Sequence, residues 1–578
     1  MIQNNRVLNR SHEKFISGIK KSIKKNELNL FCFSSSKIDI YKKMNKSCLI
    51  LVLMSFVLFG NSQNWSKSFT AGNTDVNGVF LGGSEVLQLI GHKNKLYAST
   101  GYWQDQNNIW YGGTNSNIGW GQIISLDSPN GQWKEDFNLG SSYLRPEVLK
   151  QIIFTKSASG NSLPTPDTLL LTAGYSTNYL TSVVTVKSFV RDDINNVWKA
   201  SQIVQGGFPA GENYSIRDVE VYTDQLTGLE RVYASVGTKG IFVGTYNPSS
   251  PGKIDWVSIP EMGPIGIRSL GIATANNTMY FSSGNKLYKR NDGSTVTYSV
   301  AHDFSDLSAT INSAVGGIRG LTTIQNPNAN DEALLMMWCP NGQSNGVIYR
   351  LEADGQAGFN RFYETKVSML VENFLLGCSV NYLLGAYNEF YEYINPITND
   401  TIHLIGFEAD ISGGGYPTWN GYYSGALFAK RDVNMQYSLE EINGSISSNV
   451  APLVSNRCYV KSPFINEPDV MYYGGFDPNG NESTNMAWIF KKDFLVNGIS
   501  HLNHDKIKFS VHPNPANNVL NVNLETDYRV KCEVISIIGK TVRSCTIDFG
   551  LNFIDVSGLS PNIYFIKIDN DIIKFIKN

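Results

Sequence analysis

The sequence has little that could stabilise a fold covalently or hold a metal. Only 7 of its 578 residues are cysteine, and no two of them form a C-x-x-C pair. Cys32 and Cys48 lie in segments that we expect to be absent from the mature protein, which leaves an odd and scattered set. We therefore expect no disulfide framework, no zinc site and no cofactor. Cys532 and Cys545 could still pair with each other within the last domain.

Charge and known catalytic motifs are also scarce. Charged residues make up 17% of the chain, the formal net charge is -2, and the mature region has no long basic run. These features argue against nucleic-acid binding and against a polybasic membrane patch. The sequence has no G-x-S-x-G elbow, no H-E-x-x-H pair and no P-loop, and His92, His302 and His403 share no metal-ligand spacing. No reaction can be assigned from motifs.

One apolar run near the N-terminus is typical of a signal peptide. Residues 48–59 follow a short basic segment that begins at Met44, and small residues at 60–62 end the run. A run of this length is too short to span a membrane, so we expect no stable transmembrane segment in the mature protein. We expect translation to start at Met44, with 1–43 an upstream extension, 44–62 the signal peptide and cleavage after Ser62. Export is the first function that the sequence indicates.

The residues that are abundant favour β-structure. Aromatic residues make up 12% of the chain, and 52 residues are glycine. Aromatic side chains suit a pleated surface, and glycine supplies the positive φ of tight turns. The sequence therefore predicts an all-β protein.

A repeat extends through residues 68–494. Ile216-Arg217, Ile267-Arg268 and Ile318-Arg319 recur at intervals of 51 residues, and each opens an apolar strand that a second strand follows. Weaker copies lie on both sides of these three. Seven units with about four short strands each are typical of a seven-bladed β-propeller. Six or eight blades, or a pair of β-sandwiches, also fit the pattern.

The first strand of each unit carries a charged residue at one position. In a propeller this strand lines the central channel, so the seven residues should form a ring. They are Glu85, Glu147, Arg217, Arg268, Arg319, Glu389 and Arg457. The ring is either an anion-binding pocket at the channel mouth, since guanidinium groups bind carboxylate, sulfate or phosphate bidentately, or a structural ring in which the charges neutralise one another.

Aromatic residues in glycine- and asparagine-rich loops suggest a second kind of site. They could stack on sugars, or they could cap the blades as apolar packing. They are Tyr102, Trp103, Trp110, Tyr111, Trp120, Tyr416, Trp419, Tyr422 and Tyr423. Asp477-Pro478-Asn479-Gly480-Asn481 spaces its oxygen ligands as calcium loops do but lacks a later bidentate carboxylate, so we interpret it as a hairpin turn.

The last 71 residues, 508–578, alternate apolar and polar positions between Pro, Asn and Gly turns, which predicts a small antiparallel sandwich. Motifs occur at Pro513-Asn514-Pro515-Ala516, Gly539-Lys540, Ile554-Asp555-Val556-Ser557, Tyr564-Phe565-Ile566-Lys567 and Lys574-Phe575-Ile576-Lys577. With these motifs the segment resembles the type A sorting domain of the type IX secretion system. His512 and Asn562 depart from the usual pattern, and an adhesion module that is retained is the alternative.

The resemblance implies a partner, a location and a processing step. The partner is the type IX secretion machinery, and the location is the outside of a Gram-negative cell, either released or attached to its surface. Residues 495–507 are interpreted as the linker where the sorting domain would be removed. The domain serves as a sorting signal, so the function of the mature protein should reside in residues 68–494.

Two functions remain open at this stage. The first is binding of an extracellular glycan or anionic polymer without catalysis. The second is a secreted hydrolase or lyase in which Glu85 or Glu147 exchanges protons and the arginines hold an anion. If every ring glutamate contacted a ring arginine and no cavity lay above them, the enzyme would have no site.

Overall fold

The computed structural model describes residues 65–102, 120–140, 143–178, 181–207, 213–312, 316–385, 387–396, 398–442, 452–476, 485–494, 509–524, 530–537, 540–568 and 571–578. The chain divides into two units, Met1–Gln63 and Asn64–Asn578, and every described residue belongs to the second. The upstream extension, the signal peptide and its cleavage site lie outside the described residues. No helix among the described residues is long and apolar enough to cross a membrane.

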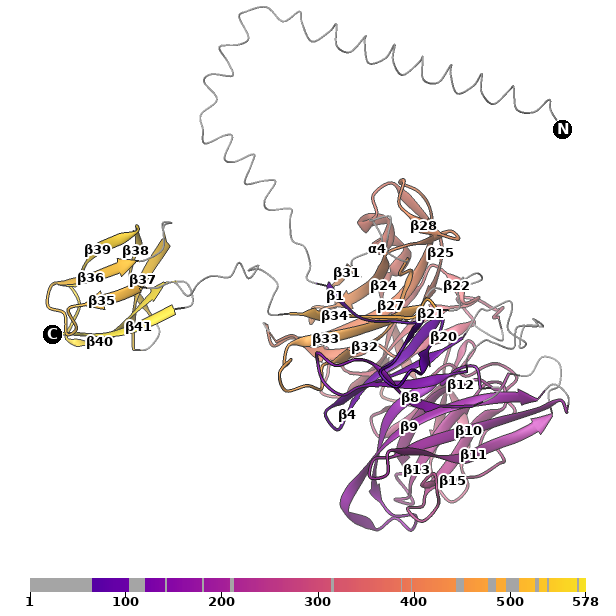
Figure 1. Cartoon of the computed structure of the whole chain (residues 1–578). Coiled ribbons are helices and arrows are strands. Elements are labelled where there is room, and N and C mark those ends of the chain that lie inside the picture. The colour runs from indigo at the N-terminus through magenta and orange to yellow at the C-terminus, as the bar shows by residue number, and fades with distance from the viewer. Residues whose placement is uncertain are drawn as a thin grey trace, which may run out of the picture. The chain divides into compact units, whose positions relative to one another are not determined.

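The fold of residues 65–494 is all-β, as the composition predicts, and consists mainly of four-stranded antiparallel sheets (Figure 1). The first is β8 (Val148–Lys156), β9 (Ser162–Asn178), β10 (Val183–Asp192) and β11 (Val197–Gly207). The second is β12 (Ile216–Thr223), β13 (Glu230–Val236), β14 (Gly240–Tyr246) and β15 (Ile254–Trp256). The third is β16 (Ile272–Ala275), β17 (Thr278–Ser283), β18 (Lys286–Asn291) and β19 (Thr297–Asp303). The fourth is β20 (Gly317–Gln325), β21 (Glu332–Cys339), β23 (Val347–Ala353) and β24 (Phe359–Lys366).

Three further runs of four strands belong to one continuous 16-stranded sheet. The first run is β4 (Glu85–His92), β5 (Lys95–Gly101), β6 (Gln122–Leu126) and β7 (Lys134–Asn138). The second is β26 (Tyr391–Ile394), β27 (Thr401–Gly413), β30 (Ala426–Arg431) and β31 (Tyr437–Ile442). The third is β32 (Ser455–Lys461), β33 (Val470–Phe476), β34 (Trp488–Asp493) and β1 (Trp65–Thr70).

Short elements extend these sheets. The end of β27 pairs with β25 (Cys378–Gly385) and β29 (Tyr422–Tyr423), which in turn pair with β22 (Gln343–Ser344) and β28 (Thr418–Trp419). The helix α4 (Val367–Phe374) precedes β25 and buries Val367 and Val371. A small hairpin, β2 (Asn73–Thr74) and β3 (Phe80–Leu81), follows β1.

The first strands of successive runs pack against one another in chain order. β4 contacts β8, β8 contacts β12, β12 contacts β16, β16 contacts β20, and β32 contacts both β26 and β4. The remaining link is a hydrogen bond of 2.7 Å from the backbone N–H of Phe390 to Oγ1 of Thr322 in β20. The first strands therefore surround a common centre, and the architecture is propeller-like.

The first described strand completes the last sheet. β1 pairs antiparallel with β34, with Trp65 opposite Lys492 and Thr70 opposite Trp488. Figure 1 shows this indigo strand beside the orange β34. The ring of Trp65 meets the ring of Tyr473 edge-on at 4.7 Å, which anchors the contact in the core.

A β-bulge interrupts several first strands near the level of the predicted ring. The register between the first and second strands shifts in β4, β12, β20 and β32. In β12 the extra residue is Arg217, and in β32 it is Arg457. Because a bulge places two consecutive residues opposite one, it re-aims side chains that strict alternation would send to opposite faces.

In three sheets a serine on the second strand accepts a hydrogen bond from the backbone of the first strand or of the residues just before it. The hydroxyl oxygens of Ser99, Ser235 and Ser282 accept hydrogen bonds of 3.1 to 3.2 Å from the backbone N–H groups of Gln88, Asp218 and Leu270. Each serine lies in a Tyr-x-Ser segment. Ser99 and Ser235 thus satisfy N–H groups beside the register shifts of β4 and β12, and Ser282 satisfies one just before β16.

We expect Ser235→Ala to lower the free energy of unfolding by about 1–3 kcal/mol, because it leaves the buried N–H of Asp218 without its acceptor. Urea denaturation followed by tryptophan fluorescence measures the change. Ser299→Ala is the matched control, because that serine is exposed and its hydroxyl group forms a hydrogen bond with the half-buried Asn291. Equal stability of the two variants would show that the serine does not support the bulge.

Residues 509–578 form two small sheets with a common core. One sheet contains β35 (Phe509–His512), β36 (Val519–Leu524) and β39 (Gly550–Asp555). The other contains β38 (Thr541–Ile547), β37 (Val530–Ser536), β40 (Asn562–Ile568) and β41 (Asp571–Lys577). Leu520 and Val522 from the first sheet pack with Ile566 and Phe575 from the second. This is the two-sheet arrangement that the sequence predicts.

Two of the predicted sorting motifs, far apart in sequence, are joined by Asn514. Its Nδ2 donates to the carbonyl of Lys574 at 3.1 Å, and its Oδ1 accepts from the N–H of Ile576 at 2.9 Å. The N–H of Ala516 also donates to the carbonyl of Ile576 at 2.8 Å. Pro513-Asn514-Pro515-Ala516 is therefore held along the last strand β41.

The other motif residues lie in turns and core positions. Oδ1 of Asp555 accepts from the N–H of Ser557 at 2.9 Å, and the N–H of Ser536 donates to the carbonyl of Lys540 at 2.9 Å. The ring of Tyr564 stacks on Phe575 at 5.8 Å, and Lys577 is buried. Gly539 lies outside the described residues. These contacts give the motifs a structural role within the domain.

Cys532 and Cys545 lie directly opposite each other on β37 and β38. We expect an oxidising thiol-disulfide reagent to link these two residues and not the cysteines of residues 65–494, since Cys339, Cys378 and Cys458 are buried and lie on the different strands β21, β25 and β32. Intact-mass measurement before and after treatment with oxidised glutathione should show the loss of two hydrogens. The same mass loss in Cys545→Ser would exclude this pairing.

Candidate functional site

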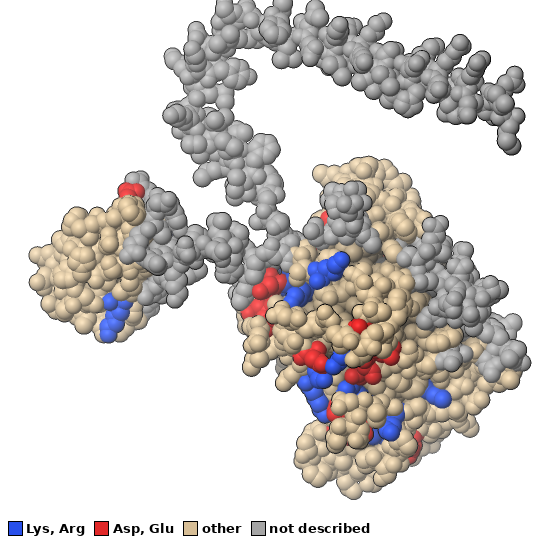
Figure 2. Space-filling view, viewed as in Figure 1, with Lys and Arg blue, Asp and Glu red and all other residues tan. Residues whose placement is uncertain are grey.

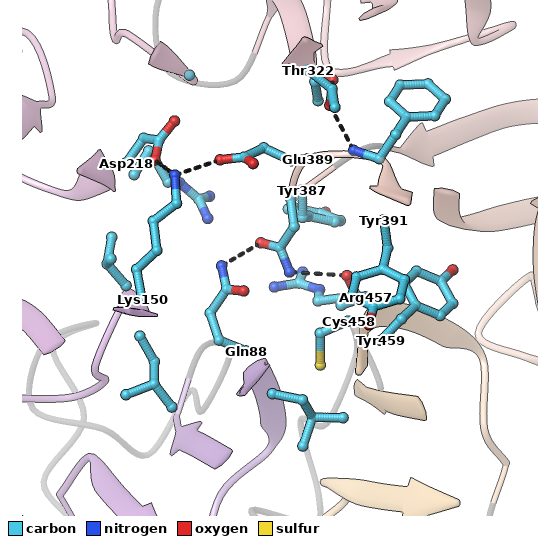
Figure 3. A pocket seen from close by; sticks show the side chains of 18 of the residues that line it. Gln88, Lys150, Asp218, Thr322, Tyr387, Glu389, Tyr391, Arg457, Cys458 and Tyr459 are labelled. Carbon is cyan, nitrogen blue, oxygen red and sulfur yellow. Dashed lines mark hydrogen bonds and ion pairs between the residues drawn. The ribbon is translucent and has the colours of Figure 1, made fainter. Parts of the chain in front are cut away.

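A cavity of about 470 Å³ lies where the first strands converge. Its walls come from β4, β8, β12, β20 and β32 and from residues 387–392 just before and within β26. Figure 3 shows these side chains directed towards a common space. Figure 2 shows acidic and basic side chains gathered close together on one face of the strands of residues 65–494. The cavity is the candidate site.

A buried network of ion pairs holds two of the predicted ring glutamates. Glu85 contacts Arg145 at 2.9 Å and Arg457 at 2.6 Å, and Arg145 contacts Glu147 at 2.7 Å. Glu147 also accepts a hydrogen bond of 2.6 Å from the backbone N–H of Ile216. Burial opposes the charge of Arg145, but Glu147 and Glu85 outweigh it and hold the pKa of its guanidinium above its usual value. These glutamates serve as structural partners of arginine.

Ring arginines surround the phenol of Tyr387. The guanidinium carbons of Arg457, Arg319 and Arg217 lie 3.5, 4.7 and 5.9 Å from the centre of its ring. The hydroxyl of Tyr387 donates to the buried carboxylate of Glu408 at 3.0 Å. Burial, reinforced by Glu408, raises the pKa of Tyr387 to about 12, so the phenol keeps its proton and its ring face is available to the cations.

Arg217 is the ring member whose charge is least compensated. Among the described residues no carboxylate lies within ion-pair distance of its guanidinium, and its buried Nε has no hydrogen-bond partner. Burial and the nearby Arg268 and Arg145 hold the pKa of Arg217 well below its usual value. Burial also lowers the pKa of Arg268 to about 10. Arg217 lines the cavity, so an anion there would be stabilised by it.

Lys150 organises the acidic side of the cavity. Its ammonium contacts Asp218 at 3.0 Å, Glu220 at 3.2 Å and Glu389 at 2.8 Å. Figure 3 shows the lysine reaching from β8 to Asp218 and Glu389. Burial opposes its charge, but the carboxylates hold the pKa of Lys150 well above its usual value. Its charge is therefore fixed across neutral pH.

Glu389 shares this lysine with two other carboxylates. Enclosure by the cavity walls, together with Asp218 and Glu220, raises the pKa of Glu389 to about 7, although Lys150 acts in the opposite direction. Its side chain is 42% exposed towards the cavity, whereas that of Asp218 is 6% exposed. Glu389 is thus an ionisable group at the open side of the cluster.

We expect Glu389→Gln to flatten the dependence of stability on pH. The folded chain holds this proton more tightly than the unfolded chain, so the contribution of Glu389 to stability is lost as the pH rises from about 4.3 towards 7. At pH 8 the variant should melt at a higher temperature than the wild type. Melting curves between pH 5 and pH 8 measure the effect, and Asp255→Asn, an exposed change, should retain the wild-type slope.

The structure divides the predicted ring into two groups. Glu85, Glu147, Arg217, Arg319 and Arg457 belong to the buried network or surround Tyr387, and Arg268 lies near them. Glu389 instead contacts Lys150. An enzyme site would be excluded if every ring glutamate contacted a ring arginine and no cavity lay above them. A cavity is present, and Glu389 has no arginine partner among the described residues, so this exclusion does not apply.

Sequence reasoning missed several residues of the site. Arg145 lies two positions before Glu147, and Lys150 lies three positions after it. Tyr387 and Asn388 directly precede Glu389. The side chain of Asn388 bridges the first strands, since it receives a hydrogen bond of 3.0 Å from Gln88 and donates to the carbonyl oxygens of Leu87 and Arg457. The recurring Tyr-x-Ser segments were the sequence signal that could have revealed the bulges.

The aromatic residues of the loops are partly buried packing. Tyr102, Tyr422 and Tyr423 are buried, and Tyr416 packs against Tyr423. Trp120 and Trp419 are half-buried. Trp103, Trp110, Tyr111 and the loop 477–481 lie outside the described residues. For the buried tyrosines the structure supports the interpretation as apolar caps.

The comparison with protein families identifies the C-terminal domain. Residues 510–578 match the family model of the secretion system C-terminal sorting domain. The chain thus carries a type IX secretion sorting domain, as its motifs predict, and it is exported to the cell surface or beyond.

The comparison with solved structures returns propeller-containing proteins with low identity. The α-L-arabinofuranosidase Arb93A from Fusarium graminearum is 10% identical, with a TM-score of 0.34 over 76% of this chain and 99% of that chain. PorZ, a surface component of the type IX secretion system of Porphyromonas gingivalis, is 10% identical, with a TM-score of 0.29 over 86% and 70%. The Aleuria aurantia lectin is 13% identical, with a TM-score of 0.29 over 64% and 98%. None of the curated proteins compared with the chain matches it.

Proposed function

We propose that residues 68–494, together with the start of β1, form a seven-bladed β-propeller whose central cavity binds an extracellular anionic ligand, a glycan or an anionic polymer. Seven runs of four antiparallel strands and the neighbour order of their first strands support the blade number. Export by the sorting domain supports an extracellular ligand.

The observation that carries the proposal is the position of Arg217. The side chain of Arg217 is half-buried, its Nε is buried without a hydrogen-bond partner, and it has no carboxylate partner among the described residues. Such a charge is costly to the fold, and it lines a cavity large enough for a small ligand. An anionic group at this position would supply the missing partner and form bidentate hydrogen bonds. Carboxylate, sulfate and phosphate groups of glycans have this chemistry.

A screen of the purified mature protein against acidic and neutral oligosaccharides tests the proposal. We expect acidic members to raise the melting temperature and neutral analogues to have no effect, with the shift decreasing as salt screens the charges. Absence of a shift with every anion, including sulfate and phosphate, would contradict it.

A hydrolase or lyase is the second candidate, and Glu389 is the observation that favours it. A carboxyl with a pKa of about 7 at the open side of a cavity is suited to general acid catalysis, with Glu220 as the second carboxyl group beside it. Glu85 and Glu147 do not suit this role, because both are held in buried arginine pairs. Product release from a bound acidic polysaccharide that Glu389→Gln abolishes would establish it, and intact polysaccharide after long incubation would exclude it.

A further inference from the structure

The two sides of the cavity carry unbalanced charges of opposite sign. On one side Arg217 has no carboxylate partner among the described residues. On the other side the single ammonium group of Lys150 contacts three carboxylates. When all three are ionised, it compensates one negative charge and leaves two in excess. A simple anion would satisfy only the first side.

The acidic side has carboxylate oxygens that accept no hydrogen bond from the described residues. Asp218 is fully used, because its oxygens accept from Lys150 and from the backbone N–H groups of Val219 and Ile272. Glu220 and Glu389 each contact Lys150 through one oxygen, Oε2 and Oε1 respectively, and the described residues donate nothing to the other. Their side chains are 30% and 42% exposed. Glu389 lines the cavity, and Glu220 lies beside it, two residues beyond the lining residue Asp218.

The bulge in β12 brings the two sides onto one strand. Arg217 is the extra residue of the bulge, and Asp218 and Glu220 lie two positions apart on the same face. Three residues of extended strand place Arg217 about 10 Å from the level of Glu220. One sugar ring with charged groups at opposite ends spans such a distance.

The rest of the lining suits a sugar. The half-buried Tyr391, whose ring centre lies 6.1 Å from that of the buried Tyr459, contributes an aromatic face on which the apolar face of a pyranose can pack. The amides of Gln88 and Asn388 line the same cavity, and such groups bind hydroxyl groups. Figure 3 shows the tyrosines and the Lys150 cluster around the same space.

Building on the proposed function, we propose that the ligand is an amino sugar that also carries an anionic group, with the anion bound by Arg217 and the ammonium bound by Glu220 and Glu389. Lys150 demonstrates that the cluster accepts an ammonium group at hydrogen-bond distance. The anion is a phosphate or a carboxylate, and both fit the fork of a guanidinium.

Calorimetric titration of the full-length mature protein with matched sugars tests this assignment. Glucosamine 6-phosphate and N-acetylglucosamine 6-phosphate share the phosphate and differ in the ammonium. 2-Amino-2-deoxyglucuronic acid and its N-acetyl derivative form the equivalent carboxylate pair. We expect the free amine of at least one pair to bind at least about 10-fold more tightly than its acetylated form, and the pair that does so identifies the anion.

Two variants test whether the acidic side of the cavity causes the preference for the free amine. Glu389→Gln and Glu220→Gln should each reduce the ratio of affinities within the preferred pair, and Asp306→Asn, an exposed change far from the cavity lining, should retain it. If either cavity variant is unstable, the other still gives the ratio.

The outcomes separate this inference from the proposed function. Equal affinity for the amine and its acetylated form in both pairs would overturn the ammonium site while leaving an anion-binding cavity. Absence of binding by all four sugars overturns the amino-sugar assignment, and absence of a response to sulfate and other anions as well overturns the proposed function. An unchanged ratio in both glutamate variants would show that the acidic cluster does not bind the amine.

Discussion

Replacing Glu85 by glutamine should lower the free energy of unfolding by about 3–5 kcal/mol, because it removes the charge that two buried guanidinium groups share. The carboxylate of Glu85 is fully buried between Arg145 and Arg457, which come from different parts of the chain. Without it, two cations remain close together in a site with little solvent. Urea denaturation of the purified protein measures the change.

Asp306→Asn is the control for this experiment. Asp306 is paired with Arg361 as Glu85 is paired with its arginines, but its side chain is 57% exposed. Exposed pairs contribute little because water and salt screen them, so this variant should unfold as the wild type does. If Glu85→Gln were as stable as this control, the buried network would not stabilise the fold, and a binding role for Glu85 would regain support.

Arg217→Met should have the opposite effect on stability and should abolish anion binding. The folded chain holds this half-buried guanidinium, with its Nε buried, near Arg268 and Arg145, so its replacement by an apolar side chain of similar length should stabilise the protein by about 1 kcal/mol. At the same time the variant should lose at least about 10-fold in affinity for acidic ligands, because a bidentate partner is removed. Melting temperatures with and without added sulfate measure both effects together.

Arg361→Met distinguishes this result from a general effect of removing an arginine. Arg361 is paired with Asp306 near the surface, so its loss should neither stabilise the protein nor alter the response to sulfate. A destabilised Arg217→Met that still responds to sulfate would contradict both parts of the prediction. A gain in stability with the loss of binding is the usual signature of a functional site that the fold tolerates at a cost.

The all-β class and the sorting domain were predictable from the sequence for simple reasons. Alternating apolar positions determine which face of a strand is buried, and motif residues such as Asn514 and Tyr564 recur in fixed positions because they hold turns and core contacts. The charged position of the first strands was visible because the spacing from Arg217 to Arg268 and Arg319 is constant.

The contacts of those charges were not predictable, because a one-residue bulge changes which side chains share a face. Strict alternation places Arg217 and Asp218 on opposite faces, whereas the register shift in β12 allows both to line the cavity. Ion pairs between residues of different sheets are equally unpredictable from the sequence. Lys150 and Glu389 are far apart in the sequence and meet only because the first strands surround one centre.

The pairing of β1 with β34 also determines when the sheet can be completed. Trp65 and its partner Lys492 are separated by more than four hundred residues, so almost the whole chain must be made before the two strands can meet. Contacts between such distant residues have a high loop-closure cost and form slowly. Until β34 has been made, β1 lacks its partner, so folding of the last sheet is a late event.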